Sequence, residues 1–103
     1  MSTNTISLEI FPWLTEVFVA GRTNRLRLEE ERYEGDTVRS LLLRLAQSYP
    51  GFAQRVFDPK TQELSDQVSL FHNSRFLELV GGLDTPLAPG DELLLLPAWE
   101  GGC

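Results

Sequence analysis

Few residues of this chain have the type and spacing that chemistry requires, and the most suggestive of them lie together at its end. Gly101 and Gly102 are followed by Cys103, the single cysteine of the sequence. A thiol in an exposed terminus reacts through its thiolate form. Two successive glycines give a slender backbone that can enter a narrow site, because neither residue carries a Cβ. We interpret this tail as the functional part of the chain, and an inert frayed end is the alternative.

The other reactive residue types do not form a catalytic pattern. His72 is the only histidine, and an isolated histidine is more often solvated or satisfied in a core than used as a ligand. Ser7, Ser69 and Ser74 lack the Gly-x-Ser-x-Gly setting of a hydrolase nucleophile. Gly81-Gly82 lacks the spacing of a phosphate-binding loop. The residues therefore favour a protein that is not an enzyme and has no metal site.

Composition narrows the class of protein further. The 103 residues suffice for one domain, with 42% apolar and 23% charged residues. Fifteen acidic against nine basic residues give a formal charge of −6, which argues against nucleic acid and favours a partner with a basic surface. Met1 to Thr5 has no signal-peptide pattern and no run approaches membrane-spanning length, so we expect a cytoplasmic protein. One cysteine agrees with a reducing compartment.

The tail follows a segment that predicts a central strand. Ala88 to Asp91 suits a type II turn, since proline stands at its second and glycine at its third position. Leu93 to Leu96 is an apolar run too short for a helix and without alternation, which is typical of a strand covered on both faces. Pro97 ends it because proline has no amide hydrogen. We therefore expect one domain over residues 1–97 and a flexible tail over residues 98–103.

The elements before that strand follow from periodicity. Alternation from Ile6 to Ile10 predicts a strand, and Arg25 to Tyr33 predicts a second strand that completes a hairpin. Thr37 is placed to cap a helix that ends near Tyr49-Pro50-Gly51. The apolar stripe of this helix consists of Val38, Leu41, Leu42 and Leu45.

After one further helical turn between Phe52 and Phe57, two short strands are expected. Asp66 to Phe71 forms one and Phe76 to Val80 the other, with a turn over His72 to Arg75 between them. Because helical residues separate the first hairpin from the later strands, the last strand can run parallel to the first in the middle of a mixed sheet. The predicted fold class is α+β, with one main helix packed on one sheet face.

Five short motifs follow one another along the chain: Gly35-Asp36-Thr37-Val38, Gly81-Gly82-Leu83-Asp84-Thr85-Pro86-Leu87, Pro89-Gly90-Asp91-Glu92, Leu96-Pro97 and Gly101-Gly102. In this order and spacing, they resemble those of the MoaD/ThiS family, the ubiquitin-like β-grasp sulfur carriers. The similarity extends from about Ile6 to Gly102. A terminal diglycine alone is a weak signal, and its specificity comes from the turns that precede it.

The resemblance implies a carrier rather than a catalyst. In this family an E1-like adenylating enzyme uses ATP to activate the terminal glycine carboxylate, here that of Gly102, and sulfur then replaces AMP to leave a thiocarboxylate. A sulfur-accepting synthase would take the sulfur, and no cofactor is bound by the carrier itself. Cys103 would be a cap that a JAMM-type metalloprotease removes; an incidental residue or a sulfur-bearing thiol are the alternatives.

Two other functions remain open. The chain could be a ubiquitin-like modifier joined through Gly102 to a lysine, or a β-grasp interaction domain with an inert tail. The route that would use the sulfur also stays open among molybdopterin, thiamin, cysteine and thiolated-metabolite synthesis. For a partner-binding surface, the sequence suggests an apolar patch on the sheet face that the helix leaves uncovered. Its predicted members are Phe71, Phe76, Leu94 and Trp99.

Overall fold

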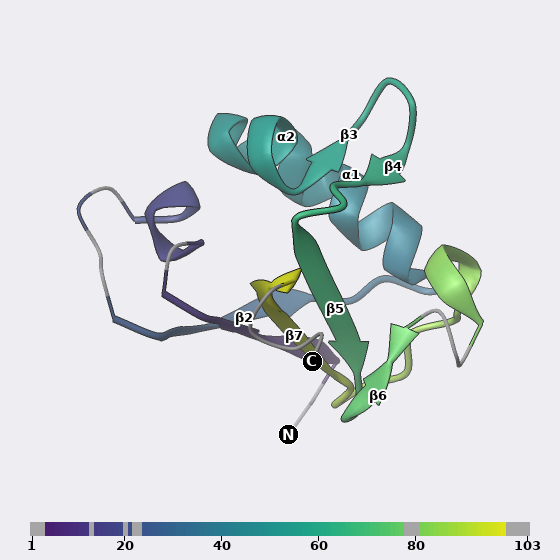
Figure 1. Ribbon diagram of the computed structural model, residues 1–103. Helices are drawn as coiled ribbons and strands as arrows, with labels where there is room; N and C mark the ends of the chain where they lie inside the picture. The colour runs from purple at the N-terminus through teal and green to yellow at the C-terminus, as the bar shows by residue number, and fades with distance from the viewer. Residues whose placement is uncertain (1–3, 13, 20, 22–23, 78–80, 99–103) are drawn as a thin grey trace.

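The computed structural model describes residues 4–12, 14–19, 21, 24–77 and 81–98 (Figure 1). Within them, strands, α-helices and short 3-10 helices follow one another along the chain. In order, these are β1 Thr5–Ile10, η1 Thr15–Val17, β2 Leu26–Glu31, α1 Val38–Ser48, α2 Pro50–Arg55, β3 Phe57–Asp58, β4 Glu63–Leu64, β5 Val68–His72, β6 Arg75–Phe76, η3 Gly82–Asp84 and β7 Glu92–Pro97.

The main sheet has the strand order β2-β1-β7-β5-β6 in the described chain. β7 runs parallel to β1, with Leu8 opposite Leu93, and antiparallel to β5, with Leu70 opposite Leu95. The prediction that the leucine run forms the central strand is thus confirmed. The parallel pairing is possible because α1 and α2 bring the chain back across the sheet between the two strands. A small second sheet, β3-β4, was not expected from the sequence.

Helix α1 begins where its capping residue predicts. The Thr37 side chain accepts a hydrogen bond from the Ser40 backbone amide at 3.2 Å, and the Ser40 hydroxyl accepts one from the Thr37 amide at 2.9 Å. This reciprocal pair satisfies two amides that have no partner inside the helix. The helix ends at Ser48. Pro50 then serves as the first residue of α2, earlier than the helical turn expected after Phe52.

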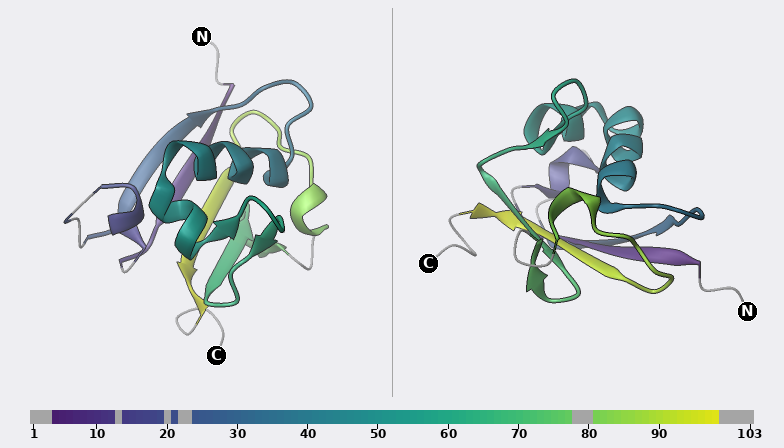
Figure 2. Two further views of the ribbon diagram at one scale, coloured as in Figure 1. Left: turned by 90° about the horizontal axis from the view of Figure 1, so that it is seen from above. Right: turned by 90° about the vertical axis from the view of Figure 1, so that its right-hand side faces the viewer.

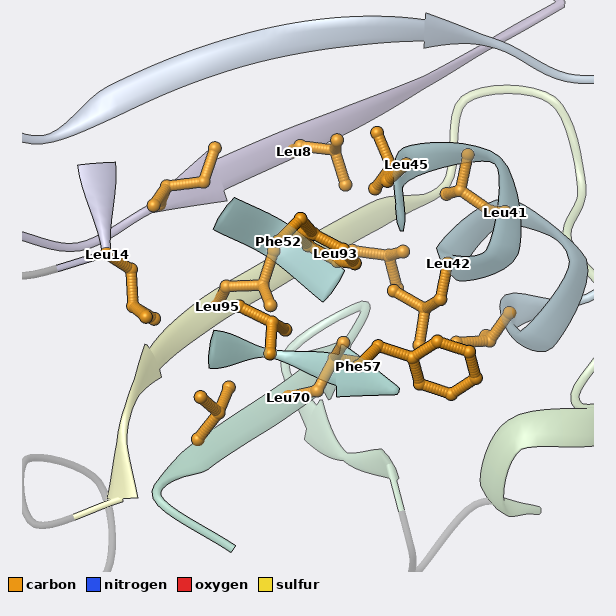
Figure 3. Packing of buried hydrophobic residues seen from close by; sticks show 14 of the residues in the cluster. Leu8, Leu14, Leu41, Leu42, Leu45, Phe52, Phe57, Leu70, Leu93 and Leu95 are labelled. Carbon is orange, nitrogen blue, oxygen red and sulfur yellow. The ribbon is translucent and has the colours of Figure 1, made fainter. Parts of the chain in front are cut away.

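Both helices lie on one face of the main sheet (Figure 2). The core lies between the helices and the sheet and is a cluster of buried apolar side chains. Leu93 and Leu95 of the central strand belong to it and are each 1% exposed (Figure 3). Leu94 points to the other face and is only partly buried. The expectation of cover on both faces was therefore wrong for Leu94, because no described helix lies over that second face, which we call the outer face.

A charged clamp holds the start of α1 against the end of β2. Asp36 is 6% exposed and accepts hydrogen bonds from both terminal nitrogens of Arg44 at 2.8 Å. It also accepts hydrogen bonds from the Ser40 hydroxyl at 2.6 Å and the Tyr33 amide at 2.9 Å. The hydrogen bonds from Arg44 outweigh the opposing effect of burial, so the pKa of Asp36 lies far below its ordinary value. Arg44 in turn lies over the ring of Tyr33.

Candidate functional site

The root of the tail is held from both sides by neighbouring strands. The Phe11 amide donates to the Leu95 carbonyl at 2.9 Å, just beyond the end of β1. The Ala98 amide donates to the Gln67 carbonyl at 2.8 Å, just before the start of β5. β7 therefore remains fixed up to Ala98, the last residue that the structure describes, and the tail departs from a rigid position.

The residues that the sequence singled out for chemistry lie beyond this point. Gly101, Gly102 and Cys103, together with the predicted contact residue Trp99, fall outside the described residues. Their assignments, and that of the flexible tail, stay predictions.

The remaining predicted contact residues are brought together on the outer face. Leu94 of β7 is opposite Phe71 of β5, which is itself opposite Phe76 of β6. The two phenylalanine rings are 5.6 Å apart between centroids and tilted by 58°, and all three side chains are partly exposed. The turn that sets this pairing has positive φ at Asn73 and Ser74, as a two-residue hairpin requires. Leu94, Phe71 and Phe76 form one row across three strands, which we call the apolar row.

A small pocket of about 90 Å³ opens beside the apolar row. Its rim is polar and charged, with Arg27 from β2, Ser7 and Glu9 from β1, and Glu92 from β7. The sequence reasoning missed these rim residues. Each stands at an outward position of its own strand, but only the register of three strands shows that they meet.

His72 is satisfied within the fold. Its Nε2 lies 2.9 Å from an Asp91 carboxylate oxygen, and both side chains are largely buried. Burial raises the pKa of Asp91, but hydrogen bonds from the Ala88 amide, His72 and Asn73 outweigh it and hold that pKa below its ordinary value. This cluster ties the turn before β7 to the β5-β6 turn, as the interpretation of a satisfied histidine expects.

Neither a metal-binding cluster nor a membrane-spanning helix is found among the described residues. No group of three histidine, cysteine, aspartate or glutamate side chains in the described ranges is placed to hold a metal ion. None of the helices in the described part of the chain is long and apolar enough to cross a membrane.

The sheet topology is that of a known fold. A mixed sheet in which the first and last strands pair in parallel at the centre, with helices on one face, is the ubiquitin-like β-grasp fold. The chain belongs to the ThiS family, whose model matches residues 17–102.

Known proteins similar to this chain include a sulfur carrier protein and a small archaeal modifier protein. The sulfur carrier protein CysO of Mycobacterium tuberculosis is 35% identical over 69 residues, which are 66% of this chain and 74% of that protein. The crystal structure of small archaeal modifier protein 1 from Haloferax volcanii has a TM-score of 0.64 at 31% identity, covering 90% of this chain and 95% of that one. The solution structure of Urm1 from Trypanosoma brucei has a TM-score of 0.70 at 26% identity, covering 94% and 95%.

Proposed function

We propose that this chain is a sulfur carrier whose Gly102 carboxylate is converted to a thiocarboxylate. The observation that carries the proposal is the position of the diglycine, a few residues beyond the fixed central strand of a ThiS-family β-grasp domain. The family match extends to residue 102, and the identity to a sulfur carrier protein supports the same function.

The chemistry requires a free carboxylate at Gly102. One of its oxygens attacks the α-phosphorus of ATP and pyrophosphate leaves, which gives an acyl-adenylate. Sulfide then attacks the acyl carbon and AMP leaves, so that the C–O bond to phosphate is replaced by a C–S bond. The catalyst of both steps is a separate E1-like adenylating enzyme, and ATP is bound by that enzyme rather than by the carrier. A sulfur-accepting synthase would complete the cycle.

The tail must reach the partner's active site from its fixed root. The four residues from Trp99 to Gly102 span at most about 14 Å when extended. The partner must therefore bind close to the end of β7, and the apolar row lies on the same sheet. We propose that Leu94, Phe71 and Phe76, with Trp99, dock on the adenylating enzyme. The partial exposure of the apolar row supports this, because apolar side chains grouped on an uncovered sheet face commonly mark an interface.

Cys103 must be removed before activation. In the longer chain the Gly102 carbonyl is held in a peptide bond, and a side chain at the next position would have to pass where glycine alone fits. We propose that a JAMM-type metalloprotease cleaves after Gly102 and removes Cys103 with any residue beyond it.

The decisive experiment compares chains that end at Cys103, at Gly102 and at Gly101. Each is incubated with the source organism's adenylating enzyme, ATP and sulfide, and intact mass reports the replacement of oxygen by sulfur. We expect conversion of the chain ending at Gly102 alone. The chain ending at Gly101 is the matched control, since it offers a glycine carboxylate one residue too early. Conversion of the longest chain with Cys103 retained would contradict the cap hypothesis.

A modifier function is the second candidate, favoured by the likeness to small archaeal modifier protein 1 at 31% identity. It predicts a different product when the chain is incubated with ATP in a cell extract of the source organism, namely an isopeptide bond between Gly102 and a lysine of another protein. Peptide mass spectrometry after proteolysis would detect this bond. Formation of the thiocarboxylate without any isopeptide product would contradict the modifier function and support the carrier function.

A further inference from the structure

The pocket on the outer face is the right size for a single side chain. Its volume is about 90 Å³, and its apolar wall is formed by Leu94 and Phe71 of the apolar row. Pockets that enclose whole metabolites usually measure about 300 to 1,000 Å³. The pocket is therefore suited to a group that projects from a protein partner.

The charged side chains around the rim of the pocket differ in whether they have an ion-pair or hydrogen-bond partner. Arg25 pairs with Glu9 at 2.6 Å, and Arg27 donates to the Ser7 hydroxyl at 3.2 Å. Glu92 differs: within the described residues its carboxylate has neither an ion pair nor a hydrogen bond, although its backbone amide is bonded to Asn73. The Glu92 carboxylate thus stands at the rim with its hydrogen-bonding capacity unused.

We propose that this pocket receives an arginine side chain of the docking partner. The aliphatic part of the side chain packs on Leu94, while the guanidinium lies against the Phe71 ring and pairs with Glu92. Arginine fits better than lysine, because a planar and weakly hydrated guanidinium stacks on an aromatic ring and bonds a carboxylate with two nitrogens. The rim carries two carboxylates, Glu9 and Glu92, against one guanidinium, that of Arg27, so its charge balance disfavours an anionic group. The net charge of −6 attracts a basic partner over longer distances.

The identity of the partner as the adenylating enzyme rests on the proposed function, whereas the preference for arginine rests on the pocket alone. The two are tested separately. The first test uses the peptide acetyl-Gly-Arg-Gly-amide as a probe, with its citrulline counterpart as a neutral analogue of the same shape and its lysine counterpart as a second cation. Binding is followed by the amide nitrogen and proton shifts of the carrier in NMR titrations.

We expect the arginine peptide to shift the amides of Phe71 and Leu94 and to bind about fivefold more tightly than the citrulline peptide, a ratio at the upper end of the range for an exposed ion pair. Glu92→Gln should abolish this difference. Glu63→Gln is the matched control, because Glu63 is exposed on β4, which lies beside the helices and on the opposite side of the main sheet from the outer face (Figure 1). Equal binding of the arginine and citrulline peptides, or an unchanged response in Glu92→Gln, would overturn the proposal, and equal binding of the lysine peptide would overturn its preference for arginine.

The second test measures adenylation of the chain ending at Gly102. Glu92→Gln should raise the KM for the carrier about fivefold and leave kcat unchanged, because an ion pair that is formed equally in the bound and transition states contributes to binding alone. Glu63→Gln should leave both constants unchanged. If the wild-type chain is not adenylated at all, the proposed function is wrong, and the peptide titrations still test whether the pocket binds an arginine side chain. Unchanged kinetic constants for adenylation of the Glu92→Gln variant would show that the pocket is not part of the interface with the adenylating enzyme.

Discussion

Replacing Asp36 by asparagine should destabilise the fold strongly, because this carboxylate is the buried centre of the clamp between α1 and β2. The substitution keeps the size of the side chain but removes its negative charge and replaces one oxygen by a hydrogen-bond donor. Asp36 accepts four hydrogen bonds, two from Arg44 and one each from Ser40 and Tyr33. An asparagine at this position would direct its amide group at one of these donors.

The expected cost follows from the burial of the two partners. Removing one member of a buried ion pair costs about 3 to 5 kcal/mol. The Asp36 side chain is 6% exposed, but that of Arg44 is 33% exposed, so water can solvate the guanidinium in part after the substitution. We therefore expect a loss at the lower end of that range, about 3 kcal/mol at neutral pH.

The dependence on pH gives the sharper test. Because the folded pKa of Asp36 is depressed, its contribution to stability is fully present above its ordinary pKa of 3.8 and is lost as pH falls toward the folded pKa. Between those two values each pH unit removes about 1.4 kcal/mol of the contribution. The difference in unfolding free energy between wild type and Asp36→Asn should therefore narrow below pH 3.8. Other carboxyl groups titrate alike in both proteins and cancel in the difference.

Urea denaturation followed by circular dichroism at several pH values between about 7 and about 2.5 would measure this difference. Asp66→Asn is the matched control, since Asp66 is exposed and should show no loss at any pH. A cost that stays constant down to the lowest pH would refute the argument, because it would mean that the charge of Asp36 contributes nothing and that packing alone is affected. A cost below about 1 kcal/mol at neutral pH would refute the magnitude.

Two further substitutions test the core and the turn before η3 by the same denaturation assay. Leu95→Ala should cost about 2 to 5 kcal/mol, because the side chain is 1% exposed in the central strand, and a cost under about 1 kcal/mol would contradict its place in the core. Gly81→Ala should cost about 1 to 3 kcal/mol, because φ is +121° and a Cβ would lie 2.6 Å from the Thr85 hydroxyl oxygen. Gly51→Ala in α2 is the control for Gly81→Ala, because a Cβ at Gly51 would make ordinary contacts with Val17. The gain in helix propensity should stabilise the fold by up to about 1 kcal/mol. Equal effects of the two substitutions would contradict the turn geometry at Gly81.

Local patterns were sufficient where one residue type has a single physical role. Thr37 caps α1, Gly90 takes the positive φ of 86° that the predicted turn requires, and the alternating residues of β1 point alternately into and out of the core. Such features depend on neighbours within a few positions, which the sequence displays directly. Local patterns did not predict the β3-β4 pair, because strands of only two residues show no periodicity in the sequence.

The features that depend on register were only partly predictable. The sequence suggested that Phe71, Phe76 and Leu94 lie on an uncovered face, and the pairing of β7 with β5 and of β5 with β6 brings them into one row. Glu92 gave no signal of its own, since a lone acidic residue after a turn is ordinary in a solvated strand. Its place beside the apolar row is fixed by partners that are far away in the chain.

The order of residues was enough to predict most of the elements and the central position of the last strand, because these rest on local conformational preferences and on residue type. The chemistry assigned to Gly101 and Gly102 stays a prediction. The matching of charges became visible only in the folded chain. Arg44 lies against Asp36 in a buried clamp, whereas the Glu92 carboxylate stands beside Leu94 without an ion-pair partner among the described residues. The reason is that electrostatic energy depends on distance and burial in space, and strand register and helix packing set both of these between residues far apart in sequence.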